Sequence, residues 1–415
     1  MEIKNIQGYE ILDSRGNPTT ACSVDLVDGT KAIAYVPSGA STGSHEAVEL
    51  RDGDRSRFNG LGVLKAINNI NTTIKQALLN QNAYNQKSID TILLDLDGTK
   101  NKSNLGANAT LAVSLAVARA SAMSQGKELY QYIKDIYNQN SIESKIFPQI
   151  GFNVLNGGKH ADSGLDIQEY MIMPLKDNIE DNIRIGSEIY HTLKKILSQQ
   201  GQIISVGDEG GFAPRLDNNE AGLKLLVQSI QEAGYVPGVD CAIALDVAAT
   251  EFFNSNVQNY TFDKQSYSGS ELTSIYQTWL QKYPIISIED PFSEDDYENW
   301  NNFQEIMNNN NLQIVGDDLL VTNTNRIQNA ISQKLCNSVL IKPNQIGTLT
   351  ETLEAISLAH NNNLTTMISH RSGETIDTFI ADLAVGVSAR YMKSGAPARA
   401  ERVSKYNRLL EIYYF

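Results

Sequence analysis

Cysteine is scarce in this sequence, which contains only three among 415 residues: Cys22, Cys241 and Cys336. The count is odd, and the three positions show no CxxC spacing. Two of the three lie in or beside apolar runs. A disulfide framework is therefore excluded, and we expect buried, reduced thiols in a cytoplasmic protein.

Clusters of positive charge are also missing. The chain carries 34 Lys and Arg residues against 48 Asp and Glu, a net charge of −14, and has no Lys/Arg-rich run. Because the electrostatic field of a negatively charged protein repels phosphate backbones and anionic lipids, we expect neither nucleic acid nor a membrane as a partner. An anionic ligand must then be met by a local group of cations or by a metal ion.

Long hydrophobic runs and nucleotide motifs are absent as well. The most apolar helix candidate, ATLAVSLAVA, meets Arg119 after ten residues, which is too short to span a bilayer, and no signal peptide is visible in MEIKNIQGYEILDSRGNP. The glycine-containing segments VGDEGGF (206–212) and PSGASTGSHE (37–46) match neither GxxxxGK[ST] nor GxGxxG. They suit mobile loops that close over a ligand, and the first of them contains Glu209.

The back half of the chain contains six short apolar runs that each end in a charged or imidazole side chain. These strand-end residues are Asp246, Glu289, Asp317, Lys342, His370 and Lys393. Their separations of 43, 28, 25, 28 and 23 residues leave room for a helix and two loops each time. The pattern predicts buried parallel strands alternating with helices, which is typical of a barrel with its chemistry at one rim.

The front part mixes strand-like alternation with amphipathic helices up to about residue 137. The polar segment YNQNSIESK (137–145) is the best boundary, so we expect one domain at 1–137 and a second at 138–415. The second domain has close to the typical barrel size of about 250 residues.

Three of the strand-end residues are carboxylates, namely Asp246, Glu289 and Asp317. At successive strand ends they would converge on one point, and an oxygen-only site without Cys or adjacent His suits Mg²⁺ better than Zn²⁺. The alternative is that acidic residues flank strands by chance or cap helices. Three in register followed by a lysine favour the metal site.

Two lysines follow at later strand ends. Lys342 lies one strand beyond the third carboxylate, and nearby cations would lower its pKa and let it act as a neutral base. The alternative is a lysine that only pairs with the acidic cluster, and this applies more readily to Lys393 than to Lys342.

Further polar residues are expected at the same rim. The segment SHRSGE brings together His370, Arg371 and Ser372, a ready grip for a phosphate or carboxylate, although Arg-Ser-Gly is also an ordinary loop. A comparable rim position is expected for three residues at the ends of the segments NGGKH and DIQE: His160, Gln168 and Glu169.

One local motif indicates different chemistry. TILLDLDGT, with Asp95, Asp97 and Thr99, matches the DxDGT signature of haloacid-dehalogenase-type phosphatases, in which an apolar strand precedes a nucleophilic Asp. The match is short and lies deep in the first domain, so we give it little weight.

Together, a dozen ordered motifs resemble the enolase family. They run from DSRGNP (13–18) through PSGASTG, LDGTKNKSNLGAN, NGGKHAD, DIQEYMIMP, VGDEGGFAP, LDVAATEF, IEDPF, GDDLLVTN, IKPNQIGT, SHRSGET and GAPAR to KYNRLL (405–410). The resemblance covers essentially the full length. It implies an α/β protein with an N-terminal α+β domain and a C-terminal (β/α)8 TIM-like barrel whose first units are irregular in order and in one strand direction.

The resemblance also implies a reaction, the dehydration of 2-phosphoglycerate to phosphoenolpyruvate with two Mg²⁺ ions per site. Lys342 matches the base for the C2 proton and Glu209 the acid for the C3 hydroxyl. The metal ligands match Asp246, Glu289 and Asp317, with Ser41 for the second ion. Substrate contacts match Gln168, Arg371, Ser372 and Lys393, with supporting positions at His160, Glu169 and His370.

The family further implies a homodimer, with octamers known, and a cytoplasmic enzyme with a secondary secreted or cell-surface pool. As an acid, Glu209 must carry a proton, and carboxylates such as Glu169 would raise its pKa. Two alternatives stay open. The chain could serve mainly as a binding protein, or it could be a racemase or acid-sugar dehydratase of the same superfamily, although the KxK pair common in those enzymes is not found.

The chain departs from the family pattern in two places. The usual Gly-Gln-Ile-Lys-Thr-Gly around the last lysine is Arg-Tyr-Met-Lys-Ser-Gly at 390–395, and the chain ends in IYYF where an acidic tail is common. The first change concerns the strand that carries Lys393, and the second concerns the surface.

Overall fold

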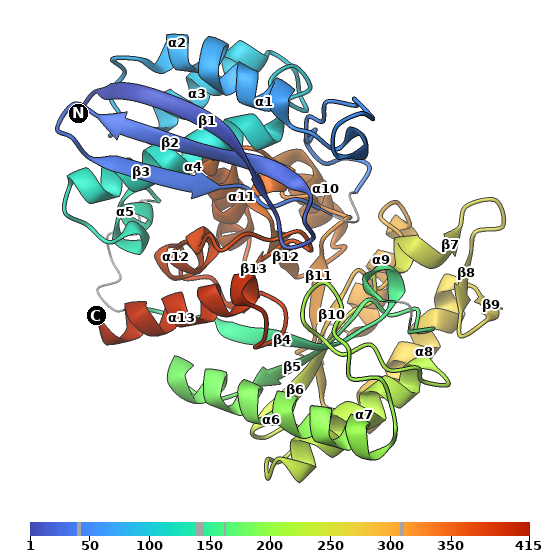
Figure 1. Cartoon of the computed structure of the whole chain (residues 1–415). Coiled ribbons are helices and arrows are strands. Elements are labelled where there is room, and N and C mark those ends of the chain that lie inside the picture. Colours follow the sequence, from blue (N-terminus) through green and yellow to red (C-terminus); the bar gives the residue numbers. More distant parts are fainter. Residues whose placement is uncertain (40–42, 138–144, 162, 308–310) are drawn as a thin grey trace.

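The computed structural model describes residues 1–39, 43–137, 145–161, 163–307 and 311–415. It consists of an N-terminal domain and a barrel domain (Figure 1). The N-terminal domain contains an antiparallel sheet of β1 (Ile3–Leu12), β2 (Pro18–Leu26) and β3 (Lys31–Tyr35). Its helices are α1 (Leu64–Asn69), α2 (Lys75–Leu78), α3 (Gln86–Asp97), α4 (Ala107–Ser124) and α5 (Leu129–Ile136).

The expected alanine-rich helix is α4, which packs against β2 and β3. It is buried on nearly all sides, because the sheet covers one face and other helices and the barrel cover the rest. No helix among the described residues is long and apolar enough to cross a membrane.

Eight strands of the described chain close the barrel in the order β10-β11-β12-β13-β14-β4-β5-β6. Their bounds are β4 (Gln149–Asn156), β5 (Glu169–Pro174), β6 (Cys241–Asp246), β10 (Ile285–Glu289), β11 (Gln313–Gly316), β12 (Ser338–Ile341), β13 (Thr365–Ser369) and β14 (Tyr391–Lys393). The six apolar runs before the strand-end residues are thus confirmed as strands. Buried side chains such as Met171, Leu340 and Met367 fill the interior, so the barrel is a packed core.

The first units of the barrel are irregular, as the resemblance implies. Strand β5 is antiparallel to both β4 and β6, while the other neighbours are parallel. Because β5 runs the opposite way, its first residue Glu169 pairs with Asp246, the last residue of β6. The start of β5 therefore lies at the rim where the parallel strands end.

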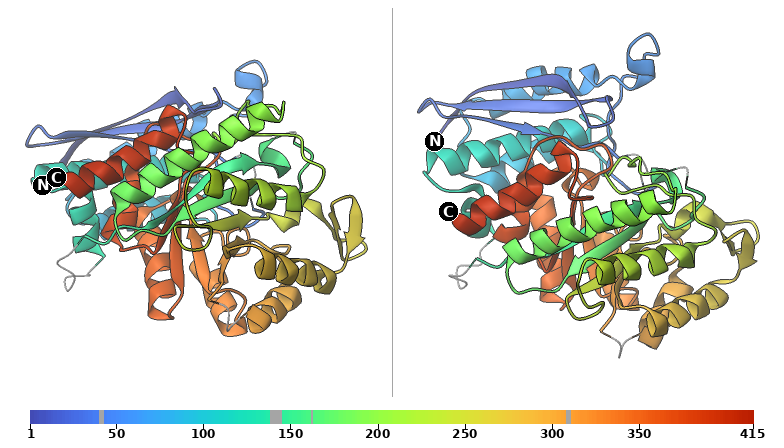
Figure 2. Two further views of the ribbon diagram at one scale, coloured as in Figure 1. Left: turned by 90° about the horizontal axis from the view of Figure 1, so that it is seen from below. Right: turned by 60° about the horizontal axis from the view of Figure 1, so that its bottom comes forward.

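Helices surround the barrel. They are α6 (Ile179–Gln199), α7 (Asn219–Glu232), α8 (Gly269–Lys282), α9 (Tyr297–Met307), α10 (Thr324–Gln333), α11 (Leu349–Asn361), α12 (Phe379–Gly386) and α13 (Ala400–Tyr414). A small hairpin sheet of β7 (Phe253–Asn254), β8 (Asn259–Phe262) and β9 (Gln265–Tyr267) precedes α8. Figure 2 shows α13 alongside α6.

Local signals in the sequence explain where several helices begin. Ser268 and Glu271 form a capping box at α8, and the Thr348 side chain accepts from the Glu351 N–H at α11. The phosphatase alternative is wrong, because the apolar residues before Asp97 form the helix α3 and not a strand. Asp97 instead accepts backbone N–H groups of Thr99, Asn104 and Leu105 and so orders a turn.

The N-terminal domain contacts the barrel near its rim. Asp377, between β13 and α12, accepts from the guanidinium of Arg119 on α4 at 2.5 and 2.7 Å and from the N–H of Tyr35 at 2.9 Å. A backbone bridge joins Ser38 to Gly373, two residues beyond Arg371. Both domains thus position the segment that follows β13.

Candidate active site

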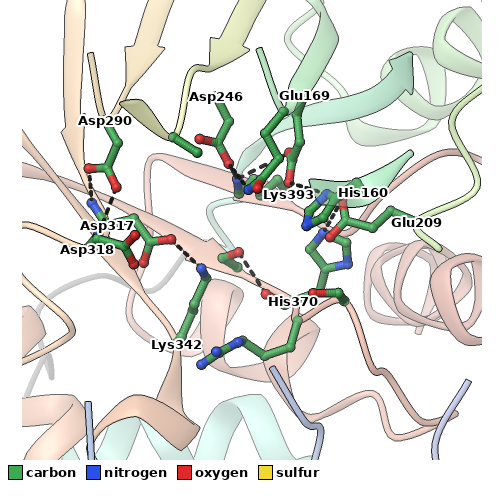
Figure 3. Close-up of a pocket in the computed structure, with 15 residues that line it drawn as sticks. His160, Glu169, Glu209, Asp246, Asp290, Asp317, Asp318, Lys342, His370 and Lys393 are labelled. Atoms are coloured by element: carbon green, nitrogen blue, oxygen red, sulfur yellow. Dashed lines mark hydrogen bonds and ion pairs between the residues drawn. The ribbon is translucent and has the colours of Figure 1, made fainter. Parts of the chain in front are cut away.

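A polar pocket lies at the rim where the parallel strands end (Figure 3). It is lined by His160, Gln168, Glu169, Glu209, Asp246, Ala248, Asp290, Asp317, Asp318, Lys342, Ser369, His370, Arg371, Ser372 and Lys393. Most of the residues that the sequence nominates are therefore in one place. Ser41 lies outside the described residues, and Glu289 reaches the pocket through its contacts with Lys393.

Lys393 is almost fully buried and is surrounded by carboxylates. Its Nζ lies 2.8 Å from Glu289 Oε2 and 3.2 Å from both Asp246 Oδ2 and Glu169 Oε2. Burial alone would lower the pKa of Lys393, but these three carboxylates raise it well above its usual value. Lys393 is therefore a fixed cation that compensates part of the negative charge.

Lys342 makes a direct ion pair with Asp317, whose other oxygen accepts from Gln345 at 2.9 Å. Burial and the cations Arg371 and Lys393 act to lower the pKa of Lys342, yet the contact with Asp317 raises it. The expectation of a lowered lysine pKa is thus wrong for this arrangement. Lys342 is protonated as long as Asp317 is its partner.

The expected trio of metal ligands is divided between the two lysines. Asp246 and Glu289 contact Lys393, while Asp317 contacts Lys342. A tighter group at this rim is formed by Asp317 with Asp290 and Asp318, whose oxygens lie within 4.8 Å of one another. Asp290 also accepts the backbone N–H groups of Asp317 and Asp318, each at 2.9 Å.

The donor set nevertheless fits a divalent cation. It consists of carboxylate oxygens, which Mg²⁺ prefers, and these already draw two ammonium groups into a buried site. The carboxylates would bind an ion only after exchanging part of their contacts with Lys342 and Lys393.

Glu209 lies at another part of the pocket. It extends from the loop after α6, accepts from Asn153 Nδ2 at 2.9 Å, and lies 3.5 Å from His370 Nε2 and 3.7 Å from His160 Nδ1. Burial would raise the pKa of Glu209, but His370, His160 and Arg402 lower it well below its usual range. The expectation of a raised pKa at Glu209 is therefore wrong.

The raised pKa belongs instead to Glu169, where burial and the neighbouring Glu209 both act in that direction, against Lys393. His160 Nδ1 lies 4.0 Å from Glu169, so one imidazole faces both carboxylates. Glu169 and Glu209 form a coupled acid pair in which Glu169 holds the proton more strongly.

Arg371 supplies a cation that suits an anionic ligand, and Gln168 supplies an acceptor that suits a hydroxyl group. Gln168 Nε2 is 3.4 Å from Asp246 Oδ2, while its buried Oε1 has no hydrogen-bond partner in the described structure. The Arg371 guanidinium is held by Glu46 at 3.0 and 3.2 Å and by Asn344 at 3.0 Å. A buried acceptor without a partner in a polar pocket can receive a hydrogen bond from a bound molecule.

Comparison with known protein families gives two adjacent matches. Residues 3–133 match the enolase N-terminal domain, and residues 144–413 match the enolase C-terminal TIM barrel domain. The chain belongs to the enolase family.

In this enolase-family chain, the altered segment 390–395 still forms the last barrel strand. Strand β14 pairs with β13 from Met367↔Tyr391 to Ser369↔Lys393, and with β4 from Tyr391↔Gln149 to Lys393↔Gly151. Strand β14 is thus paired on both sides without a register shift, and Lys393 reaches the pocket.

Several polar residues in or beside the pocket of this enolase-family chain are not predicted from the sequence. Asp290 and Asp318 directly follow nominated residues in the segments IED and GDD, so adjacency was the available signal. Glu46 and Gln345 gave no such signal, because their importance comes from contacts between distant segments. Gln345 Nε2 donates to Glu46 Oε1 at 3.3 Å and to Asp317 Oδ1 at 2.9 Å. It thereby links Glu46, the partner of Arg371, to Asp317.

Proposed function

We propose that this chain catalyses the reversible, Mg²⁺-dependent dehydration of 2-phosphoglycerate to phosphoenolpyruvate. The proposal rests on two groups of side chains that line one buried pocket. In the first, Lys342 lies beside the carboxylate of Asp317, and in the second, Glu169 and Glu209 lie beside the imidazole of His160. The first group suits removal of a proton from carbon, and the second suits departure of a hydroxyl group.

Lys342 would take the C2 proton. For this it must be neutral, and the contact with Asp317 opposes that by raising the pKa of the amine. Asp317, Asp246 and Glu289 would hold the divalent cation, and Lys342 would then lose the partner that keeps it protonated. The nearby cations Arg371 and Lys393 then favour the neutral amine.

Proton removal beside a carboxylate gathers negative charge on its oxygens, and cations must stabilise that charge. Bound Mg²⁺ supplies such charge, as is general for enolase-superfamily sites. Among the chain's own groups, Lys393 and Arg371 contribute fixed positive charge. Ser41 remains a proposed ligand for a second ion.

The acid would be the pair of Glu169 and Glu209, with His160 facing both. Because the pair titrates as one unit, a proton held mainly by Glu169 remains available beside Glu209. Substrate contacts are proposed for Gln168, Arg371 and Ser372, with His370 supporting Glu209. We also propose domains at 1–137 and 138–415. The protein would form a homodimer, and an octamer is the alternative assembly. It would be cytoplasmic, with a secondary secreted or cell-surface pool.

The role of Lys342 is tested by exchange of the C2 hydrogen of 2-phosphoglycerate with solvent deuterium. Lys342→Ala should lower the exchange rate by about 10²–10⁴-fold, because the base is removed, while circular dichroism shows a folded protein. Exchange at the wild-type rate in the folded variant would remove Lys342 from this role.

The role of the acid pair is tested by comparing two rates in one variant. Glu209→Gln should slow formation of phosphoenolpyruvate more than C2 exchange, because the hydroxyl group departs after the proton is removed. Equal losses in both rates would contradict separate acid and base groups.

A further inference from the structure

Arg402 has a fully buried guanidinium group that contacts residues next to the pocket. It lies in the first turn of α13 and has no exposed surface. Its Nη1 donates to the Arg371 carbonyl at 2.6 Å, and its Nη2 donates to the carbonyls of Ser372 at 2.6 Å and Asp208 at 3.0 Å. One side chain thus joins the segment 370–372 to the loop that carries Glu209.

The fourth contact of Arg402 is with an imidazole. Nη1 lies 2.5 Å from His370 Nδ1. Because a guanidinium has only donors, Nδ1 of His370 must be the acceptor and cannot carry a hydrogen atom. The proton of the neutral ring then lies on Nε2, which is the nitrogen 3.5 Å from Glu209 Oε2. Arg402 therefore determines which side of His370 faces the acid with an N–H group.

The charges around His370 agree with a neutral ring. Burial lowers the pKa of His370 to about 4, and the neighbouring Arg402 adds to this effect, while Glu209 and Glu374 oppose it. Arg402 has an acidic neighbour of its own, since Glu401 Oε1 lies 3.5 Å from its Nε. Most of the guanidinium hydrogens nevertheless go to carbonyls and to the imidazole.

We propose that Arg402 is a positioning residue that locks His370 in the Nε2–H tautomer and so holds an N–H donor against Glu209. This inference deepens the proposed function, on which its catalytic part rests, because the donor would control how readily Glu209 releases or accepts a proton. A residue of this kind acts through His370 and does not touch the substrate itself.

The tautomer can be measured without substrate by ¹⁵N NMR of the full chain labelled at its histidines. The sequence has five histidines, and the signals of His370 are assigned by their loss in His370→Gln. In the wild type we expect a protonated Nε2 and an unprotonated Nδ1 throughout pH 6–8. In Arg402→Met the two nitrogens should become averaged or exchange roles, and His370 should begin to protonate at a higher pH.

Arg402→Lys keeps the positive charge but replaces the planar guanidinium by a compact ammonium group. This variant provides the test if Arg402→Met does not fold. The lysine should restore the charge effect on His370 without restoring the fixed tautomer. A control is Arg408→Met, which removes a second arginine of α13, partly exposed and paired with Asp382 and Glu128. Arg408→Met should leave the His370 signals unchanged.

Kinetics then test the catalytic part. Arg402→Met and Arg402→Lys should slow phosphoenolpyruvate formation about 10–100-fold while changing C2 exchange less. An unchanged His370 tautomer in the folded Arg402 variants would overturn the inference, whatever reaction the chain catalyses. A changed tautomer with equal losses in both rates would overturn the link to Glu209 alone.

Discussion

At the residue scale, the pocket holds its charges in compensated groups. Lys393 contacts three carboxylates, Lys342 contacts Asp317, and Arg371 contacts Glu46. Removing ionised groups from water costs several kcal/mol per ion unless partners restore the lost interactions, so such pairing is required in a buried site. Contact with Asp317 raises the pKa of Lys342, and the neighbours His370 and His160 lower the pKa of Glu209, both opposite to the expectation from the sequence.

Asp290 provides the first prediction at this scale. Its carboxylate holds the N–H groups of Asp317 and Asp318, and an amide in its place can accept only one of them well. Asp290→Asn should therefore raise the Mg²⁺ concentration for half-maximal activity by about 10–100-fold. The control is Asp97→Asn, which disturbs a comparable turn that does not line the pocket. An equal shift in both variants would contradict a specific role of Asp290.

At the element scale, the sequence predicts the regular part of the barrel well. The strands before Asp246, Glu289, Asp317, Lys342, His370 and Lys393 follow from short apolar runs between amphipathic helices. The reversed β5 follows only from the family resemblance, because an apolar run carries no information about direction. Contacts such as Gln345 with Glu46 join segments 299 residues apart, and no local pattern encodes them.

Gly395 gives a prediction for the loop after β14. It has φ of +73°, and a Cβ atom there would lie 2.5 Å from the carbonyl oxygen of Glu209. Gly395→Ala must therefore displace the Glu209 loop and should lower the dehydration rate by about 100-fold, as expected for a misplacement near 1 Å.

The matched control for Gly395→Ala is Gly126→Ala. Gly126 has a similar φ of +63° but no atom within 4 Å of the added Cβ, so it carries the backbone strain without the contact. Both variants should lose some thermal stability, and only Gly395→Ala should lose activity in a steady-state assay. Full activity of Gly395→Ala would show that the loop tolerates the shift.

At the scale of the whole molecule, the two domains are joined by buried polar contacts. Burial would raise the pKa of Asp377, but Arg119 lowers it. The stabilisation is therefore present above the ordinary aspartate pKa of about 3.9 and is lost as the pH falls through the lower value of the folded protein.

Asp377→Asn should lower the free energy of unfolding by about 3 kcal/mol at pH 7, because the partly buried Arg119 loses its charged partner. Asp135→Asn is the control, since the pair of Asp135 with Lys127 is exposed and should contribute less than about 1 kcal/mol. Urea unfolding of both variants gives the comparison. The deficit of Asp377→Asn should shrink below about pH 4, and a deficit that stays constant would contradict the ionic origin.

The most direct test of the proposed function is the ultraviolet absorbance of phosphoenolpyruvate formed from 2-phosphoglycerate by the whole protein. The proposal predicts a rise in absorbance with Mg²⁺, its loss when a chelator is added, its return when Mg²⁺ is restored, and little or no rise in Asp317→Asn. Folded protein that gives no Mg²⁺-dependent signal would contradict the proposal and would leave a binding protein or another reaction of the enolase superfamily.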